Sequence, residues 1–194
     1  STFAHGHLDG NTVVRLTWKD RIWLFDLDYI NRSPLYHNGL VIARDGVQED
    51  PPPLTALDLA ADLPGAGLTR TSSFDFNGAD WRRNIVWKKG EYFLFLDEVK
   101  AREGGDFRLD CRFRTRGETE LGPAGLVVRQ GGKEFRILGA DGAPRRLSSE
   151  KESYWNTWNY PWGGKEIKVL DAVKSLPLEP GDGWTFAHLM YASD

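Results

Sequence analysis

The sequence is poor in sulfur and histidine and contains no long apolar run. Its single cysteine, Cys111, excludes an internal disulfide, and the alternating apolar neighbours predict that this residue lies in the core. No stretch of about 18 apolar residues is present, so we predict no membrane-spanning helix. The formal net charge of −3 lacks the basic excess that is typical of nucleic-acid-binding proteins, and we expect no nucleic-acid partner.

The N-terminus also lacks an initiator methionine and the charged and apolar regions of a signal peptide. Ser1 instead leads directly into the clearest chemical motif of the chain. We therefore expect the sequence to be a piece of a longer polypeptide. Its 194 residues, 40% of them apolar and eight of them tryptophan, are enough for one well-buried domain.

Short β-branched and aromatic runs recur along the chain and predict strands. Residues 12–18 and 21–26, parted by Lys19 and Asp20, predict a hairpin that leaves Asp26 at a strand end. Further strand signals lie at residues 68–76, 84–88, 92–100, 107–116, 125–129, 134–138, 165–170 and 184–191. Many short strands with almost no helical periodicity indicate an all-β antiparallel fold, either a sandwich or a barrel.

Three local patterns give more specific expectations. Within residues 107–114, apolar residues alternate with charged ones, which predicts a strand with one face in water. Residues 49–53 contain three consecutive prolines and predict a surface loop. Residues 54–62 could form a short helix or an edge strand. His188, between Phe186 and Met190, is expected on a strand face as a hydrogen-bonded, partly buried residue.

Three of the four histidines fall within the first 37 residues, and this clustering is the sharpest chemical signal in the chain. His5 and His7 lie two residues apart, so in an extended segment their side chains point to the same side. Asp26 at a strand end and His37 after a turn can close around the same point. Two imidazoles and one carboxylate are the donors of a zinc site with one open position. The other interpretation is a set of hydrogen-bonded histidines without a metal.

An aromatic run at residues 154–164 is too polar and too rich in proline and glycine for a core strand. Trp155, Trp158 and Trp162 could offer exposed ring faces to sugars, or the run could cap the end of the sandwich. Seven basic residues could meet acidic sugars or simply form the solvated face of a sheet. They are Arg82, Arg83, Lys88, Lys89, Arg108, Arg112 and Arg114.

Four stretches carry a family resemblance: HGHLDGNTVVRLTWKDRIWLFDLDY, YHNGLVIARDGVQ, WRRNIVWKKGEYFLFLDEVKA and LEPGDGWTFAHLMYA. Together they resemble the C-terminal β-sandwich domain of heparinase II/III-like polysaccharide lyases, a group that includes oligoalginate lyases. The most specific pieces are the His-x-His-x-Asp opening and the His-Asn pair followed by an apolar run. The resemblance implies an antiparallel β-sandwich of the supersandwich type over residues 1–194. It also implies a preceding helical toroid domain, which this sequence does not contain.

The resemblance also assigns roles to residues. It implies a zinc bound by His7, Asp26 and His37, with His5 facing the substrate as a catalytic residue. Tyr36 is a candidate substrate contact, and Tyr29 is another. The family usually has Asp-x-Gly where this chain reads Asp26-Leu27-Asp28, so Asp28 could add a ligand oxygen or a charge.

The implied activity is that of a carbon–oxygen lyase, which cleaves an acidic polysaccharide or oligosaccharide by β-elimination. That step needs a neutralised uronate carboxylate together with a positioned base and acid. The resemblance places the catalytic Tyr and the neutralising Asn or His in the helical domain, so we expect the isolated chain to be inactive. It also implies a periplasmic or extracellular location. The alternative function is a non-catalytic carbohydrate-binding or scaffolding module, and the sequence upstream of Ser1 would discriminate between the two.

Overall fold

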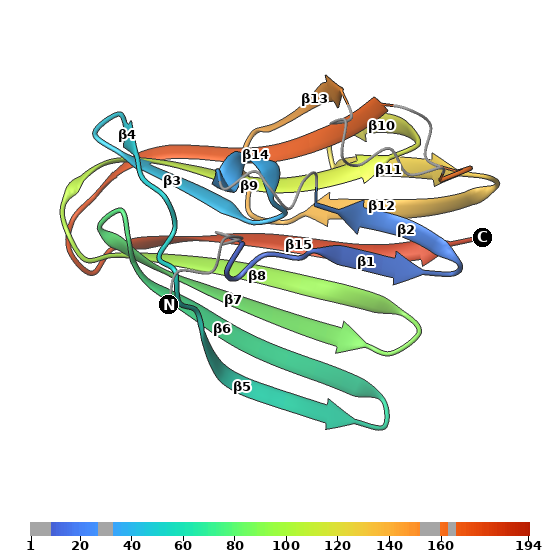
Figure 1. Ribbon diagram of the computed structural model, residues 1–194, viewed down its shortest axis with the longest axis horizontal. Coiled ribbons are helices and arrows are strands. Elements are labelled where there is room, and N and C mark those ends of the chain that lie inside the picture. The colour runs from blue at the N-terminus through green and yellow to red at the C-terminus, as the bar shows by residue number, and fades with distance from the viewer. Residues whose placement is uncertain (1–8, 27–32, 152–159, 163–165) are drawn as a thin grey trace, which may run out of the picture.

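The chain folds into antiparallel strands arranged in two facing sheets (Figure 1). The computed structural model describes residues 9–26, 33–151, 160–162 and 166–194. The larger sheet comprises β5 (Ala56–Leu63), β6 (Ala66–Phe76), β7 (Ala79–Lys88), β8 (Tyr92–Ala101), β10 (Glu118–Gly122), β11 (Gly125–Gln130), β12 (Lys133–Gly139) and β15 (Gly183–Ser193). The smaller sheet comprises β3 (Leu40–Arg44), β4 (Val47–Gln48), β9 (Gly105–Arg116), β13 (Arg145–Lys151) and β14 (Glu166–Leu178).

The strand order is β10-β11-β12-β15-β8-β7-β6-β5 in the larger sheet and β13-β14-β9-β3-β4 in the smaller one. Neither order closes on itself, so the predicted antiparallel β-sandwich is confirmed and the barrel is excluded. Within the described residues, the only helical element is the 3-10 turn η1 (Pro34–Tyr36). No helix in this part of the chain is long and apolar enough to cross a membrane.

The predicted N-terminal hairpin is confirmed as β1 (Arg15–Trp18) paired with β2 (Arg21–Phe25). Its turn residues Lys19 and Asp20 both have positive φ, 49° and 59°, the backbone that suits a two-residue hairpin loop. The hairpin packs onto the larger sheet, where Trp23 stacks on Phe135 with ring centroids 5.2 Å apart. Because this contact is fully buried, it holds the middle of β2 against the larger sheet.

The open question about residues 54–62 resolves in favour of a strand, because β5 is the edge strand of the larger sheet. Its side chains are exposed along almost its whole length. Figure 1 shows why, since β5, β6 and β7 extend beyond the smaller sheet. Residues 49–53 form no strand, as predicted. Three strands were missed, the two-residue β4 and the more polar β10 and β13, and all three are edge strands.

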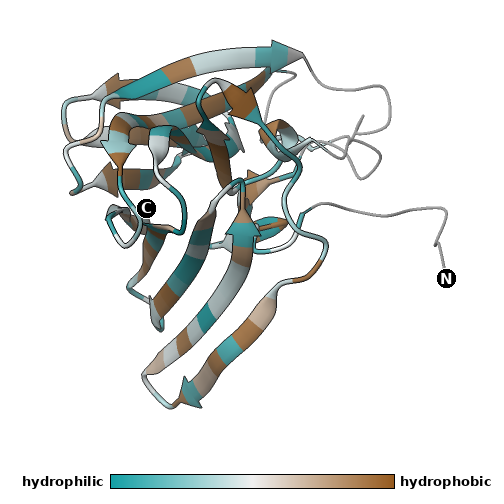
Figure 2. Cartoon of the chain, turned by 90° about the vertical axis from the view of Figure 1, so that its left-hand side faces the viewer, coloured by the Kyte–Doolittle hydropathy of each residue, from teal (hydrophilic) through white to brown (hydrophobic). Residues whose placement is uncertain are grey.

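The core lies between the sheets and is lined by alternate residues of their strands. Figure 2 shows hydrophobic and hydrophilic bands following one another along these strands. Cys111 is fully buried there, which confirms its prediction. Burial raises the pKa of its thiol well above the usual value, because the thiolate would lose its hydration, and the neighbouring Asp97 carboxylate adds to this effect. Cys111 is therefore a packing residue rather than a nucleophile.

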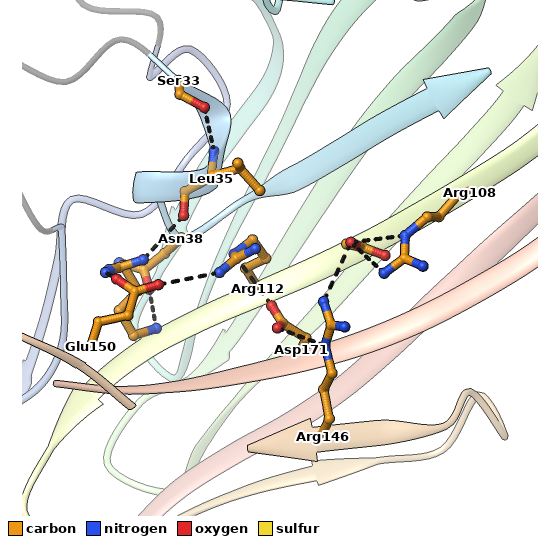
Figure 3. Close-up of polar contacts among 10 residues, drawn as sticks. Ser33, Leu35, Asn38, Arg108, Arg112, Arg146, Glu150 and Asp171 are labelled. Atoms are coloured by element: carbon orange, nitrogen blue, oxygen red, sulfur yellow. Dashed lines mark hydrogen bonds and ion pairs between the residues drawn. The ribbon is translucent and has the colours of Figure 1, made fainter. Parts of the chain in front are cut away.

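The prediction of a wet face along residues 107–114 holds only at Arg108, which is exposed, and is wrong for the rest of that face. Arg112 and Arg114 are buried, and acidic side chains of β13 and β14, the strands beside β9 in the same sheet, pair with them. Arg112 lies between Glu150 and Asp171, with nitrogen–oxygen distances of 3.6 and 3.2 Å (Figure 3). Arg114 pairs with the same Glu150. These arginines are neutralised inside the protein and do not form a surface for acidic sugars.

His188 is fully buried and has no hydrogen-bond partner for either ring nitrogen among the described residues. The expectation of a hydrogen-bonded, partly buried residue is therefore wrong. Its ring packs edge-on against Phe113 at 4.9 Å, and its Nε2 lies 4.0 Å from a carboxylate oxygen of Asp141. Burial lowers the pKa of His188 to about 4, because the imidazolium would lose its hydration in the core.

This lowered pKa predicts a stability that depends on pH. Between pH 6.5 and 4 the unfolded chain binds a proton at His188 that the folded chain does not, so the free energy of unfolding falls as the pH falls. The loss should total about 3 kcal/mol and level off below pH 4. Urea unfolding of the wild type and of His188→Phe measures the difference. A variant with the same slope as the wild type in this pH range would contradict the assignment.

Candidate functional site

Two of the predicted site residues meet at the end of the N-terminal hairpin. Asp26 is the first residue after β2, and its backbone N–H donates to the carbonyl of Val14 across the hairpin at 2.9 Å. The turn η1 ends immediately before His37, whose N–H donates to Pro34 at 3.2 Å. These two short segments bring His37 Nδ1 to 3.2 Å from Asp26 Oδ2. His37 is 1% exposed, so the pair lies at the edge of the buried core.

Asn38 completes the environment of the Asp26 carboxylate. Its backbone N–H and its side-chain amide both donate to Asp26 Oδ1, each at 3.1 Å. The second oxygen, Oδ2, faces His37. The two oxygens of this carboxylate therefore have different partners, one the amides of Asn38 and the other an imidazole.

The pair has the spacing that a zinc site requires. Two ligand atoms on one tetrahedral zinc, each about 2.0–2.2 Å from the metal, lie about 3.3 Å apart. The distance of 3.2 Å between His37 Nδ1 and Asp26 Oδ2 suits two such ligands as well as it suits a hydrogen bond. His37 Nε2 is buried and has no hydrogen-bond partner in the described part of the chain. The ring therefore has a second nitrogen that could bind a metal. The residues present therefore fit the expected metal.

The rest of the predicted ligand set lies outside the described residues. His7, the expected third ligand, and His5, the expected catalytic residue, fall in residues 1–8, while Asp28 and Tyr29 fall in residues 27–32. Among the described residues no group of three or more metal-binding side chains occurs. The structure thus brings together Asp26 and His37 of the predicted ligand set.

Tyr36, the candidate substrate contact, lies at the end of η1 beside this pair. Its side chain is half-buried, and the guanidinium carbon of Arg114 lies 6.0 Å from its ring centroid. Arg114 also donates to the carbonyl of Leu35 at 3.1 Å, which fixes the turn on which Tyr36 lies. Burial lowers the pKa of Arg114, because the guanidinium loses its hydration, although Glu150 partly offsets this effect.

Of the three tryptophans predicted to contact sugar, the structure describes Trp162, because Trp155 and Trp158 fall in residues 152–159. Its ring is 43% exposed and lies 4.0 Å from the guanidinium carbon of Arg21. Arg21 is itself buried and donates to the carbonyls of Asp20, Gln130 and Gly131 at 3.0–3.2 Å. Trp162 is therefore held against a fixed cation, an arrangement that orients an aromatic ring in solvent.

Nearby Tyr160 anchors the same segment to the sandwich. Its hydroxyl donates to Gln130 Oε1 and accepts from the N–H of Ile22, both at 2.8 Å. Trp162 lines a cleft of about 970 Å³ beside the ends of β11 and β12. The described walls of the cleft carry four basic and four acidic residues, so the cleft is polar and electrically balanced.

The sandwich with a carboxylate–imidazole pair at the end of its first hairpin can be compared with known proteins. No protein-family profile and no curated protein sequence matches the chain. Among solved structures, the heparan sulfate lyase HepC from Pedobacter heparinus covers 97% of this chain with a TM-score of 0.72 and 15% identity. A heparinase III gene product covers 100% with a TM-score of 0.75 and 14% identity, and a further heparinase III covers 96% with 0.69 and 10%.

The chain spans 31% of the length of the first two of these proteins and 30% of the third. The comparison therefore confirms the fold that the resemblance implied, namely a β-sandwich that also occurs within heparinase III and heparan sulfate lyase structures. At identities of 10–15%, the likeness is one of fold.

Proposed function

We propose that this chain is the β-sandwich domain of a polysaccharide lyase that cleaves uronate-containing glycans by β-elimination. In this proposal the chain supplies a zinc and His5 to an active site, and a helical domain outside these 194 residues completes it. The observation that carries the proposal is the buried pair of Asp26 and His37, with atoms 3.2 Å apart. This pair lies in a fold whose solved neighbours are named as heparan sulfate lyase and heparinase III.

The chain's own residues would divide the work. Asp26 and His37 would hold the metal with His7, and the buried position of His37 would keep its ring in one orientation. A bound zinc would supply positive charge close to the substrate and tie the N-terminal segment to the hairpin and to η1. His5 is the remaining histidine of the motif and is the proposed acid–base residue beside this metal. The step itself removes the proton next to the uronate carboxyl group and releases the glycosidic oxygen.

We expect the isolated chain to be inactive on uronate-containing polysaccharides. Elimination needs a base near the proton and a donor that neutralises the carboxylate, and a missing partner lowers the rate by orders of magnitude. The assay follows the ultraviolet absorbance of the unsaturated product. The same chain joined to its upstream sequence should be active, and His5→Ala should abolish that activity. Robust turnover by the 194 residues alone, lost in His5→Ala, would show that the site is complete within them.

The cleft beside Trp162 is proposed as an additional contact for the glycan. A sugar ring has an apolar face that packs on an exposed aromatic ring, and its hydroxyl groups can bond to the charged walls. This observation also favours the alternative function, a carbohydrate-binding module, because the contact needs neither the metal nor the helical domain.

We therefore expect Trp162→Ala to weaken binding of a uronate oligosaccharide about threefold to tenfold, since an aromatic contact contributes about 0.5–1.5 kcal/mol. Trp87→Ala is a matched control. Trp87 is 37% exposed and lies near the Lys89 ammonium, but it belongs to β7 and stacks on Phe93. Affinity electrophoresis compares both variants with the wild type. Equal losses in the two variants would remove the cleft from the proposal.

A further inference from the structure

Asn38 uses every polar group it has, although it is fully buried. Its N–H and side-chain amide bind Asp26 Oδ1, and the same amide donates to the carbonyl of Val13 at 2.8 Å. Its side-chain oxygen accepts from the backbone N–H of Arg114 at 2.6 Å, and its carbonyl accepts from Arg83 Nη1 at 2.9 Å. Its carbonyl also accepts from the N–H of Val13 at 3.0 Å, so six hydrogen bonds connect Asn38 to Asp26, to the segment before β1, to β9 and to β7.

These contacts constrain the Asp26 carboxylate. Turning the carboxylate plane about its Cβ–Cγ bond would break both bonds from Asn38 at once. Hydrogen bonds from amides to a charged oxygen are stronger than those between neutral groups. Asn38 therefore holds one oxygen and leaves the other, Oδ2, facing His37.

Arg83 connects this position to the core. Its guanidinium binds Asp97 through two nitrogens, Nε at 2.7 Å and Nη2 at 3.1 Å, and both side chains are at most 1% exposed. Its third nitrogen, Nη1, donates to the carbonyls of Asn38 and of Asn11 at 2.9 and 3.0 Å. Asn11 belongs to the segment that leads from His7 into β1. One planar cation thus binds the backbone at Asn38, next to His37, and at Asn11 in the segment before β1.

We propose that Asn38 is a positioning residue that fixes the orientation of the Asp26 carboxylate, so that one of its oxygens points at His37, and that the buried Arg83–Asp97 pair holds Asn38 in place. The contacts that carry this assignment do not depend on a metal. Its consequence for zinc does rest on the proposed function, because partners that orient metal ligands typically change metal affinity about 10- to 100-fold.

The test is the tautomer of the His37 ring, that is, which of its two nitrogens carries the proton. It is read from the ¹⁵N NMR shifts of these nitrogens in the metal-free chain at pH 8. With only four histidines, the signals can be assigned by single substitutions. We expect His37 in the wild type to carry its proton on Nδ1, facing Asp26. Asn38→Ala should release the carboxylate and give a mixture of the two tautomers. Asn84→Ala is the matched control, since Asn84 is also buried but bonds to Glu98 on β8.

An unchanged Nδ1–H form in Asn38→Ala would overturn the proposal, whatever the zinc result. If that variant does not fold, hydrogen exchange on the wild type decides, because both side-chain amide protons of Asn38 should exchange far more slowly than exposed amides. Fast exchange would overturn the proposal as well. A wild type that shows the expected tautomer but binds no zinc would support the role of Asn38 and contradict the proposed function. Zinc binding weakened about 10- to 100-fold in Asn38→Ala alone would support both.

Discussion

Replacing Asp97 by alanine is expected to lower the free energy of unfolding by about 3–5 kcal/mol, because the substitution leaves the buried Arg83 cation without its carboxylate. Burial disfavours the charged form of Arg83, yet the ion pair with Asp97 raises the pKa of the guanidinium above its ordinary value. The indole N–H of Trp81 would also lose its acceptor, since it donates to the same carboxylate at 2.8 Å. Urea unfolding followed by tryptophan fluorescence measures the loss.

The neighbouring pair on the same two strands provides the control. Arg82 and Glu98 face each other on the opposite side of the sheet at 3.7 Å, and their side chains are 48% and 41% exposed. Arg82→Ala should change stability by less than about 1 kcal/mol, because solvent screens that pair. Replacing both charged partners by apolar residues, in the double variant Arg83→Met with Asp97→Leu, should recover part of the stability that Asp97→Ala loses. Equal effects of Asp97→Ala and Arg82→Ala would contradict this account of the core.

His37→Ala is expected to abolish stabilisation of the chain by zinc. A metal that binds only the folded state adds about 4 kcal/mol to the free energy of unfolding at a thousand times its dissociation constant. The wild type should show this gain, and the variant should show none, since Asp26 and His7 alone leave the metal with too few ligands. His188→Phe removes a histidine from the core and should leave the zinc response intact. Equal zinc responses in wild type and His37→Ala would contradict the predicted ligand set.

Much of the fold could be predicted from local patterns. Central strands have a strand on each side and one face against the core, and such positions favour β-branched and aromatic residues. Residues 92–100, in β8, are an example. The hairpin turn at Lys19 and Asp20 could be predicted for the same local reason. β10 and β13 were missed because they lie at sheet edges, where polar side chains remain in solvent and no apolar run develops.

The burial of Arg112 and Arg114 could not be predicted from their own strand. Alternation of charged and apolar residues indicates which face is polar, but it does not indicate whether that face meets water. Here Arg114 pairs with Glu150, 36 residues later, and Arg112 pairs with Asp171, 59 residues later. Ion pairs between such distant residues depend on the strand order, which local patterns do not specify.

Only part of the candidate site could be predicted, because some of its contacts join residues that are distant in the sequence. Asp26 at a strand end and His37 after a turn are local features, and the structure places them together. Asn38 was noted only as part of the His-Asn motif. Its proposed role as a positioning residue depends on a hydrogen bond from Arg83, 45 residues away. A signal for Arg83 does exist, because it alternates with Trp81 and Ile85 on a strand face that is otherwise apolar. A charge at such a position indicates a buried partner.

Elemental analysis of the chain, purified without chelator, tests the central claim most directly. The proposed site predicts about one zinc per chain in the wild type and none in His37→Ala, with Asn84→Ala retaining the metal as a folded control. Zinc bound to an affinity tag or nonspecifically to the protein surface would be found in all three proteins. A wild type without metal that is as stable as after zinc addition would contradict the site, and Asp26 and His37 would then be a hydrogen-bonded pair within the sandwich.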